Sequence, residues 1–295
     1  MDIGLSAVFG GSPRRDAAFL RDFAVGAEEL GFASLWAPEH IVFFRDYESK
    51  YPYTPDGEVW FRPDEGIYDP IMVCQAAAAV TTTLRVATSV LIATERHPLL
   101  TAKLVMTADH LTGGRFELGV GSGWSAEEYA ALDVPFERRG ARLDEYILAM
   151  KAAWAHDEAS FHGEFVDFEG VVLFPKPITQ PHPPILVGGD SVAAMRRAAR
   201  LGDGWYGWWA GYELEPHLEK LRAELEREWR TGDPSFRLKL GRPVDLGQDS
   251  PDDVAACGVH AAALGVQELV VAAPIRASSL DADLRTWADA LNVTP

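Results

Sequence analysis

The sequence predicts an α/β fold in which eight parallel strands close into a (β/α)8 barrel with insertions. Short runs rich in apolar and β-branched residues alternate with longer helical patterns along the 295 residues. This alternation is typical of parallel strands joined by crossover helices. Eight such units are present, and eight is the number that closes a barrel. They are evenly spread and no stretch has a second domain's composition, which favours closure over the alternative, an open doubly wound sheet.

The first four units occupy the amino-terminal half of the chain. The first helix is expected to end at Gly31. Ser125-Ala126-Glu127-Glu128 resembles a capping box and begins the helix after the fourth strand. Strands are predicted at 3–9, 34–37, 84–92 and 115–120, and helices at 16–30, 70–80, from 98 to just before Gly113, and at 138–156.

The last four units follow two irregular segments. Strands are predicted at 185–187, 204–208, 238–244 and 267–272, with a helix up to Leu201 and further helices between and after the later strands. Residues 161–165 indicate a tight hairpin outside the barrel. We expect a single domain over 1–295, with insertions at about 41–68 and 157–184; long excursions of this kind usually lie over the site.

The composition excludes several classes of function. A net charge of −17 argues against nucleic-acid and anionic-membrane partners, although a local pocket can still bind an anion. No apolar run approaches the roughly 20 residues of a membrane span. Met1 to Leu5 begins directly as a strand, with an acid where a secretory signal needs basic residues, so we expect a cytoplasmic protein. Cys74 and Cys257 are interpreted as buried apolar residues.

Candidate site residues are chosen by position, because the active sites of such barrels lie at the carboxyl ends of the strands. Glu39 and His40 end the second strand. Imidazole titrates near neutrality, so His40 is a candidate general acid or base, against the alternative of a structural hydrogen bond. The other strand ends include 9–11, 88–90, 121–124, 188–190 and 207–209. The seven other histidines form no metal-binding spacing, so no metal is predicted.

Two glycine-rich turns indicate an anion site. The run from Gly119 to Gly123 follows a strand and precedes a helix, but Trp124 stands where the dinucleotide-binding pattern needs glycine. Small residues there still let backbone N–H groups approach an anion at a helix N-terminus. Gly188-Gly189 repeats the arrangement one strand later. The alternative is that these glycines only ease the strand-to-helix turns.

Arginines and aromatic residues complete the predicted rim. The arginines either bind an anionic tail or, for the three on the long helix, lie on its solvated surface; they are Arg96, Arg138, Arg139 and Arg142. Aromatic side chains at several strand ends suggest a flat-walled apolar pocket, as a conjugated ring system needs. They are Phe43, Phe44, Trp60, Phe61, Trp124, Trp205, Trp208 and Trp209.

Seven segments together resemble the luciferase-like monooxygenase superfamily, most closely its coenzyme F420 (deazaflavin)-dependent branch. The likeness extends over roughly residues 3–245 and is more specific for the superfamily than for the cofactor. The segments are 31–40 (GFASLWAPEH), 96–98 (RHP), 111–121 (LTGGRFELGVG), 123–124 (GW), 161–165 (FHGEF), 181–189 (PHPPILVGG) and 201–205 (LGDGW).

The resemblance implies a TIM barrel with insertions and a set of site residues. It implies a bulge with a cis peptide bond behind the cofactor ring, for which Ser89–Val90 is the candidate. His40 matches the catalytic or substrate-contacting histidine, and Glu39 the acid beside the ring, where many relatives have Asp. Gly121 and Ser122 replace residues of bacterial luciferase itself, so no light reaction is implied. The implied cofactor-binding residues are Glu39, His40, Thr88, Ser89, Val90, Gly121, Ser122, Gly123, Trp124, Gly188 and Gly189.

These observations lead to one expected function and two alternatives. We expect hydride transfer between coenzyme F420 and an apolar, cyclic or conjugated small molecule, with His40 donating or accepting the proton. One alternative is an FMN-dependent monooxygenase that uses O₂. The other is a flavin-binding or phosphate-binding barrel without redox turnover. The expected partners are a small-molecule substrate and a second copy of the chain in a homodimer.

Overall fold

A computed structural model describes residues 1–10, 15–54, 56–59, 64, 66–211, 213–245 and 247–295. Its strands form one nine-stranded sheet in the order β3-β2-β1-β11-β10-β9-β8-β5-β4, and an added pairing of β3 with β5 closes the ring. All of these pairings are parallel. The strands are β1 (Asp2–Ser6), β2 (Ser34–Ala37), β3 (Arg85–Thr88), β4 (Leu91–Ile92), β5 (Phe116–Gly121), β8 (Ile185–Gly188), β9 (Gly204–Trp208), β10 (Arg237–Pro243) and β11 (Glu268–Ala272).

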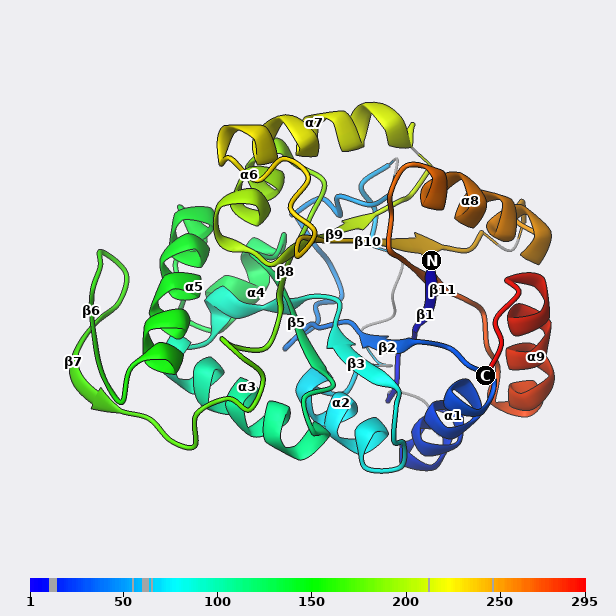
Figure 1. The fold of residues 1–295 in the computed structure, drawn as a ribbon, viewed down its shortest axis with the longest axis horizontal. Coiled ribbons are helices and arrows are strands. Elements are labelled where there is room, and N and C mark those ends of the chain that lie inside the picture. Colours follow the sequence, from blue (N-terminus) through cyan, green and yellow to red (C-terminus); the bar gives the residue numbers. More distant parts are fainter. Residues whose placement is uncertain (11–14, 55, 60–63, 65, 212, 246) are drawn as a thin grey trace.

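Helices cover the outside of this barrel (Figure 1). They are α1 (Ala17–Glu29), α2 (Pro70–Ala78), α3 (Pro98–Thr112), α4 (Ala126–Ala131), α5 (Arg139–Ala155), α6 (Val192–Leu201), α7 (Leu214–Arg227), α8 (Pro251–Ala263) and α9 (Leu280–Ala290), with short 3₁₀ turns η1 (Ala93–Glu95) and η2 (Ala277–Ser279). The predicted closed (β/α)8 barrel is therefore confirmed, and the alternative interpretation of the sequence as an open doubly wound sheet is wrong. The predicted strand at 84–92 is interrupted by Ser89 and Val90, which separate β3 from β4.

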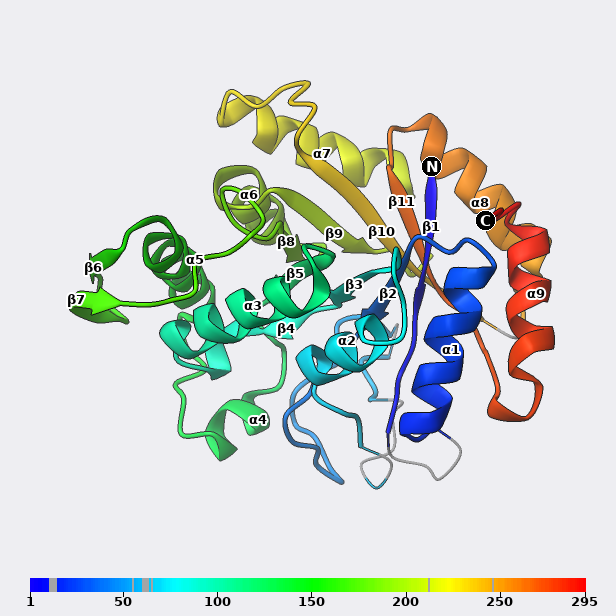
Figure 2. The same cartoon turned by 60° about the horizontal axis from the view of Figure 1, so that its bottom comes forward.

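The two predicted insertions lie outside the barrel strands. Residues 41–68 contain no helix or strand among those described. The second contains β6 (Glu158–His162) and β7 (Asp167–Val172), an antiparallel hairpin that projects beside α5 (Figure 2). The sequence prediction of a hairpin here agrees with the structure.

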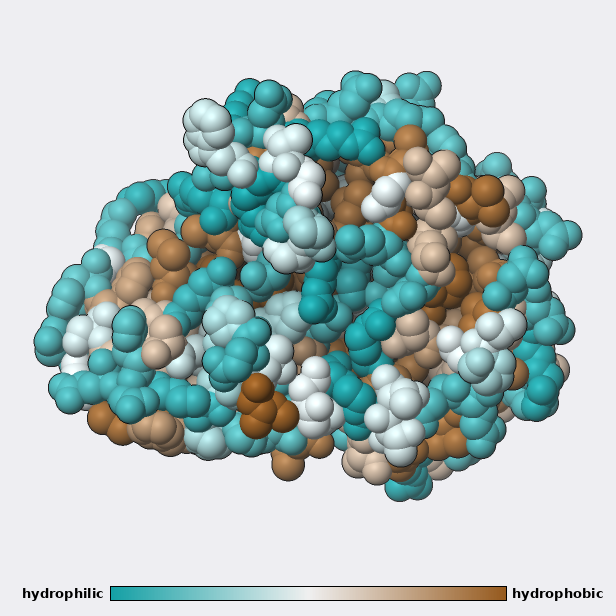
Figure 3. Space-filling view, in the orientation of Figure 1, coloured by the Kyte–Doolittle hydropathy of each residue, from teal (hydrophilic) through white to brown (hydrophobic). Residues whose placement is uncertain are grey.

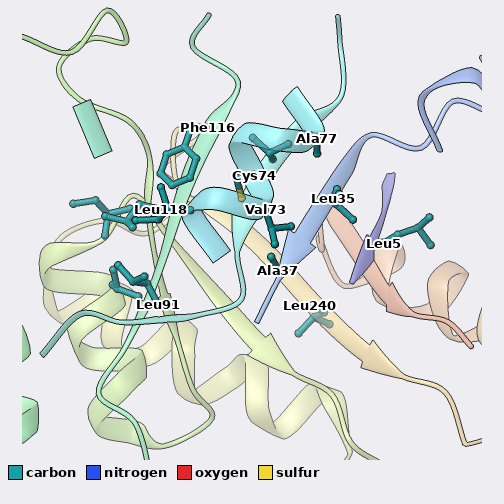
Figure 4. Packing of buried hydrophobic residues seen from close by; sticks show 14 of the residues in the cluster. Leu5, Leu35, Ala37, Val73, Cys74, Ala77, Leu91, Phe116, Leu118 and Leu240 are labelled. Carbon is teal, nitrogen blue, oxygen red and sulfur yellow. The ribbon is translucent and has the colours of Figure 1, made fainter. Parts of the chain in front are cut away.

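Strand side chains alternate between the helices and the barrel interior, as the two-residue period of a strand requires. Leu35 of β2 and Leu5 of β1 face outward, toward a core that includes Val73 and Cys74 of α2 (Figure 4). Inside, Trp36 of β2 stacks on Tyr206 of β9 with ring centroids 4.5 Å apart. The outer core joins helices to strands, while this inner layer fills the barrel below the site.

The amino-terminal end of the barrel interior is ionic. The Lys239 ammonium lies 2.5 Å from Glu117 and 2.6 Å from Glu268, and all three side chains are buried. Arg85 and Ser34 also contact the Glu268 carboxylate. Figure 3 shows hydrophilic residues gathered over the centre of the face on which the N-terminus lies. This paired layer closes the end of the barrel opposite the candidate site.

Candidate active site

The carboxyl ends of the strands surround a cavity of about 1170 Å³. Small-molecule sites commonly measure about 300–1,000 Å³, so this cavity has room for a large cofactor and a substrate together. Thr88 does not line it, because its hydroxyl donates to the carbonyl of Gly119 at 2.7 Å, between β3 and β5. The other predicted site residues all line the cavity: Glu39, His40, Ser89, Val90, Gly121, Ser122, Gly123, Trp124, Gly188 and Gly189.

His40 lies three residues after the end of β2 and is held by Glu128, a residue that the sequence indicated only as part of a helix cap. Its Nδ1 atom lies 2.7 Å from Oε2 of Glu128, on α4. The rings of Trp124 and Phe43 lie 5.6 and 5.5 Å from the imidazole, centroid to centroid. An ionised carboxylate only accepts hydrogen bonds, so in a pair with ionised Glu128 the donor is Nδ1.

Glu128 was assigned to a capping box, and that prediction is half wrong. The Ser125 hydroxyl does accept the N–H of Glu128, at 3.1 Å. The Glu128 carboxylate does not return to the N-cap; it accepts the N–H of Ile41 at 2.5 Å and of Val42 at 3.2 Å. Only the tertiary structure brings the loop after β2 to this carboxylate. The signal in the sequence was a carboxylate in the first helical turn after a strand that ends at the site.

Neighbouring Glu127 holds a second part of the same loop. Its carboxylate accepts the N–H of Glu48 at 2.7 Å and of Ser49 at 2.9 Å, and the Ser49 hydroxyl accepts the N–H of Ala126. Burial acts to raise its pKa, but hydrogen bonds, chiefly from Ser49, lower the pKa of Glu127 to about 2. The start of α4 thus anchors the first part of the 41–68 excursion, at residues 41–42 and 48–49.

Glu39 points away from this pair. Its carboxylate accepts a hydrogen bond from Arg96 at 2.5 Å and from the N–H of Ile92 at 2.6 Å. Its pKa is raised, because burial outweighs the attraction of Arg96. The carboxylate that contacts the His40 ring nitrogen therefore comes from α4 and not from Glu39. Arg96, one of the predicted rim arginines, does not line the cavity; it pairs with Glu39 and Asp69.

Glu95 is a buried carboxyl group that sequence reasoning missed. It ends the short turn η1, is 8 % exposed, and neither carboxyl oxygen has a hydrogen-bond partner among the described residues. Burial, then the negative charges of Glu128 and Glu39, raise the pKa of Glu95 to about 9, despite Arg96. The group therefore holds a proton near neutral pH, behind the His40–Glu128 pair.

The glycines of the rim have packing roles. A Cβ on Gly121 or Gly188 would lie 2.6 Å from a methyl carbon of Val90, so both glycines make room for that side chain. The peptide bond between Ser89 and Val90 is cis, at the bond that the family resemblance indicated. Gly123 has φ +64°, and its Cβ would lie 3.0 Å from Ile92. The interpretation that these glycines shape the turns is thus supported, and it is compatible with an anion nearby.

One end of the cavity combines a helix N-terminus with arginines. Ser191 caps α6, and Ser191, Ala193 and Ala194 line the cavity beside Gly189. Arg138, Arg139 and Arg197 line it as well. Such an end suits phosphate. The solvated-surface interpretation is wrong for Arg142, which is buried and donates to the carbonyl of Pro135.

The aromatic lining differs in part from the prediction. Phe43, Trp124 and Trp208 line the cavity, together with Tyr51, Tyr53 and Tyr206, which the sequence analysis did not name. Trp205 and Trp209 instead belong to the core between barrel and helices. Their place follows from strand alternation in β9, because Tyr206 and Trp208 point inward. Trp60, Phe61 and Gly11 lie outside the described residues.

Two general properties bear on the class of protein. In the part of the chain that is described, no three or more His, Cys, Asp or Glu side chains are grouped to hold a metal ion. Within the same residues, no helix has both the length and the apolar character to cross a membrane. Cys74 is buried and Cys257 half-buried, and both are free thiols.

The candidate site is thus a large cavity at the carboxyl rim of a (β/α)8 barrel, with a carboxylate-held histidine on its wall. The chain belongs to the luciferase-like monooxygenase family, whose model matches residues 1–267. It is 34% identical over 256 residues to an uncharacterized protein of Mycobacterium tuberculosis, covering 85% of this chain and 86% of that one.

Two relatives carry named activities with different cofactors. The FMNH₂-dependent dimethylsulfone monooxygenase of Pseudomonas putida is 39% identical over 208 residues, covering 70% of this chain and 49% of that one. The F420-dependent glucose-6-phosphate dehydrogenase of Kineococcus radiotolerans is 31% identical over 239 residues, covering 78% and 65%.

Solved structures share the fold at low identity. A monooxygenase from Streptomyces bottropensis superposes with a TM-score of 0.78 at 20% identity, covering 99% of both chains. The coenzyme F420-dependent tetrahydromethanopterin reductase of Methanopyrus kandleri superposes with a TM-score of 0.76 at 14% identity, covering 99% of this chain and 98% of that one. Both support the barrel fold.

Proposed function

We propose that this protein transfers a hydride between coenzyme F420 and an apolar small molecule, with His40 donating or accepting the accompanying proton. The bound deazaflavin supplies the hydride-carrying carbon. The observation that carries the choice of cofactor is the row of arginines at one end of the cavity. Arg138, Arg139 and Arg197 line the cavity together with Ser191, the N-cap of α6. Arg138 and Arg197 also pair with Glu164 and Asp144, so Arg139 is the lining arginine of this end without a carboxylate partner among the described residues. F420 has a phosphodiester and a carboxylate tail, whereas FMN has one phosphate, so an end with arginines in addition to a helix N-terminus suits the longer anionic tail of F420.

The residues present fit such a group. Val90, held between Gly121 and Gly188, forms a bulge at the cavity floor on which a flat ring can lie. The first turn of α6 offers backbone N–H groups to a phosphate beside Gly189, whose own N–H donates to the carbonyl of Tyr206. Glu39, Ser122 and Trp124 complete the walls around it. Trp124 and Phe43 shield the imidazole of His40 from water, which strengthens its hydrogen bond to Glu128.

His40 is suited to a proton-transfer role by its fixed orientation. Glu128 accepts the Nδ1 proton and is itself held by two backbone N–H groups, so the ring cannot rotate without breaking this set. A carboxylate at Nδ1 also stabilises the imidazolium that forms when Nε2 takes a proton. The proton acceptor and its stabilising charge are thus assembled before a substrate binds.

Titration of the purified protein with F420 and with FMN tests the proposal. We expect F420 to bind at least about tenfold more tightly, a difference of about 1.4 kcal/mol. Arg139→Met should weaken F420 binding more than FMN binding, whereas Arg285→Met, on the exposed surface of α9, should change neither. Comparable affinities, or tighter FMN binding, would contradict the choice of F420.

A second candidate is an FMN-dependent monooxygenase. It is favoured by the 39% identity to the FMNH₂-dependent monooxygenase of Pseudomonas putida, which exceeds the 31% to the F420-dependent relative. Oxygen consumption with reduced FMN, in the presence of candidate substrates, would support this function. The homodimer remains a prediction, which light scattering of the purified protein measures directly.

A further inference from the structure

Two arginines that line the cavity have no carboxylate partner among the described residues. Arg139 lies with its guanidinium 3.8 Å from the ring centroid of Phe136, and its Nε donates to a backbone carbonyl. Arg15 donates only to backbone carbonyls. The other two lining arginines form ion pairs with Glu164 and Asp144. In a chain of net charge −17, two such cations in one cavity indicate anionic ligands.

The strand order places these two arginines on opposite sides of the barrel mouth. Arg15 contacts residues that follow β1 and β11, which are neighbours in the sheet. Arg139 contacts Gly123, which follows β5, and β5 pairs with β8. In a ring of eight strands these two pairs are diametrically opposed. His40, after β2, lies between them.

Arg15 directly precedes Asp16, the N-cap of α1, and apolar side chains line the cavity at this end. Nη1 donates to the carbonyl of Val8 at 3.1 Å and Nη2 to that of Ile275 at 3.3 Å. A guanidinium has five N–H groups, so three remain for a ligand. Phe19, Phe23, Ile275 and Val244 line the cavity around it.

We propose that Arg15 binds the carboxylate of the substrate, and that the substrates are carboxylic acids with an apolar body. This inference rests on the proposed function, in which the arginines around α6 hold the cofactor. One guanidinium balances one negative charge, and its planar N–H groups match a carboxylate. The Arg139 end adds the N-terminus of α6 to its guanidinium, and therefore suits the phosphate of the cofactor. With its acid group at Arg15, the apolar body extends toward His40 at the centre of the mouth.

Arg15 also ties the loop after β1 to the loop after β11, so a purely structural role has to be separated from binding. A structural role predicts equal effects of an Arg15 substitution on charged and neutral ligands of the same shape. A carboxylate-binding role predicts a selective loss for the acid. The comparison of each acid with its own amide is therefore the informative measurement.

The probes are 4-phenylbutyrate and cyclohexanecarboxylate, each with its primary amide. Affinities are measured by calorimetry near neutral pH, with and without saturating F420 or FMN. We expect each acid to bind the unmodified protein at least about tenfold more tightly than its amide. Arg15→Gln should abolish this preference, Arg15→Lys should retain part of it, and Arg21→Gln, at an exposed position of α1, should leave it unchanged.

Equal affinities of acid and amide for the unmodified protein, or no binding of either acid at about 10 mM, would overturn the proposal. So would an unchanged preference in Arg15→Gln. The comparison in the unmodified protein decides the question even if the variant does not fold. Cofactor titration of the same samples separates the two hypotheses. Loss of cofactor binding contradicts the proposed function, whereas equal acid and amide binding contradicts the role of Arg15.

Discussion

His40 Nδ1 and Glu128 Oε2 lie 2.7 Å apart, although 88 residues separate them in the chain. The other oxygen of the same carboxylate accepts the N–H groups of Ile41 and Val42. One side chain of α4 therefore orients the candidate proton carrier and also fixes the backbone that follows it. This arrangement assigns the ring nitrogens distinct roles and makes Glu128 a positioning residue.

The His40–Glu128 pair predicts an ordered set of kinetic losses. His40→Ala should reduce the rate of hydride transfer by about 10² to 10⁴, the usual cost of removing a general acid or base. Glu128→Gln should reduce it by about 10–100-fold, as is typical of a partner that orients a functional histidine. Cofactor affinity should change by no more than about 1 kcal/mol. Single-turnover transfer and cofactor titration measure these effects.

Glu127→Gln is the matched control, because Glu127 precedes Glu128 on α4 but binds Glu48 and Ser49 instead of His40. Its effect on transfer should be clearly smaller than that of Glu128→Gln. Similar losses in both variants would mean that placing the loop, and not orienting the imidazole, is what matters.

Glu95 predicts an unusual dependence of stability on pH. Its pKa is raised from 4.5 to about 9 in the folded protein. The contribution of Glu95 to the free energy of unfolding is therefore fully present below about pH 4.5. It falls as the pH rises toward 9, because the Glu95 carboxyl group ionises at a lower pH in the unfolded chain than in the folded protein. Glu95→Gln should remove this loss and stabilise the protein by roughly 1–3 kcal/mol at pH 8. Urea unfolding of Glu95→Gln and of the unmodified protein at pH 5 and pH 8 measures this difference. An equal change in the free energy of unfolding at both pH values would indicate an effect of packing and not of ionisation.

The backbone conformation of Gly123 predicts a loss of stability on substitution. Its φ of +64° is unfavourable for other residues, and a Cβ would also approach Ile92. Gly123→Ala should cost about 2 kcal/mol. Gly113→Ala is the control, since Gly113 has the same φ with no atom near its Cβ, and should cost about 1 kcal/mol. Denaturant unfolding of both variants separates strain from crowding.

The ionic layer at the amino-terminal end of the barrel predicts acid sensitivity. Burial acts to raise the pKa of Glu268, but Lys239 and Arg85 lower it to about 2. Its contribution is present above about pH 4.5 and is lost as pH falls through about 2. Lys239→Met should destabilise the protein by about 3–5 kcal/mol, because it leaves two buried carboxylates without this partner. Lys50→Met, in the exposed pair with Glu58, should cost less than about 1 kcal/mol. Similar denaturant midpoints for Lys239→Met and Lys50→Met would contradict a stabilising role of the buried Lys239 pairs.

The comparison of sequence and structure shows where local patterns were sufficient. Helix and strand boundaries follow from periodicity and from local signals such as Asp16 before α1 and Gly113 after α3. Eight alternating units fixed the closed barrel, and the rule that sites lie at carboxyl strand ends selected Glu39, His40, Gly188 and Gly189. Each of these inferences depends on residues that are close in the chain.

Contacts between distant segments were decided only by the tertiary structure. From sequence, Glu128 was assigned to a helix cap, because a carboxylate in the first helical turn usually binds the nearby N-cap N–H. In the structure it binds two backbone N–H groups and the imidazole in the loop after β2. Glu95 and Arg15 have no motif; one matters through burial and the other through its place in the cavity. The sequence by itself determined the barrel and the rim, because periodicity and strand ends are local properties. The partners, charges and occupancy of that rim depend on which side chains the closed ring brings together.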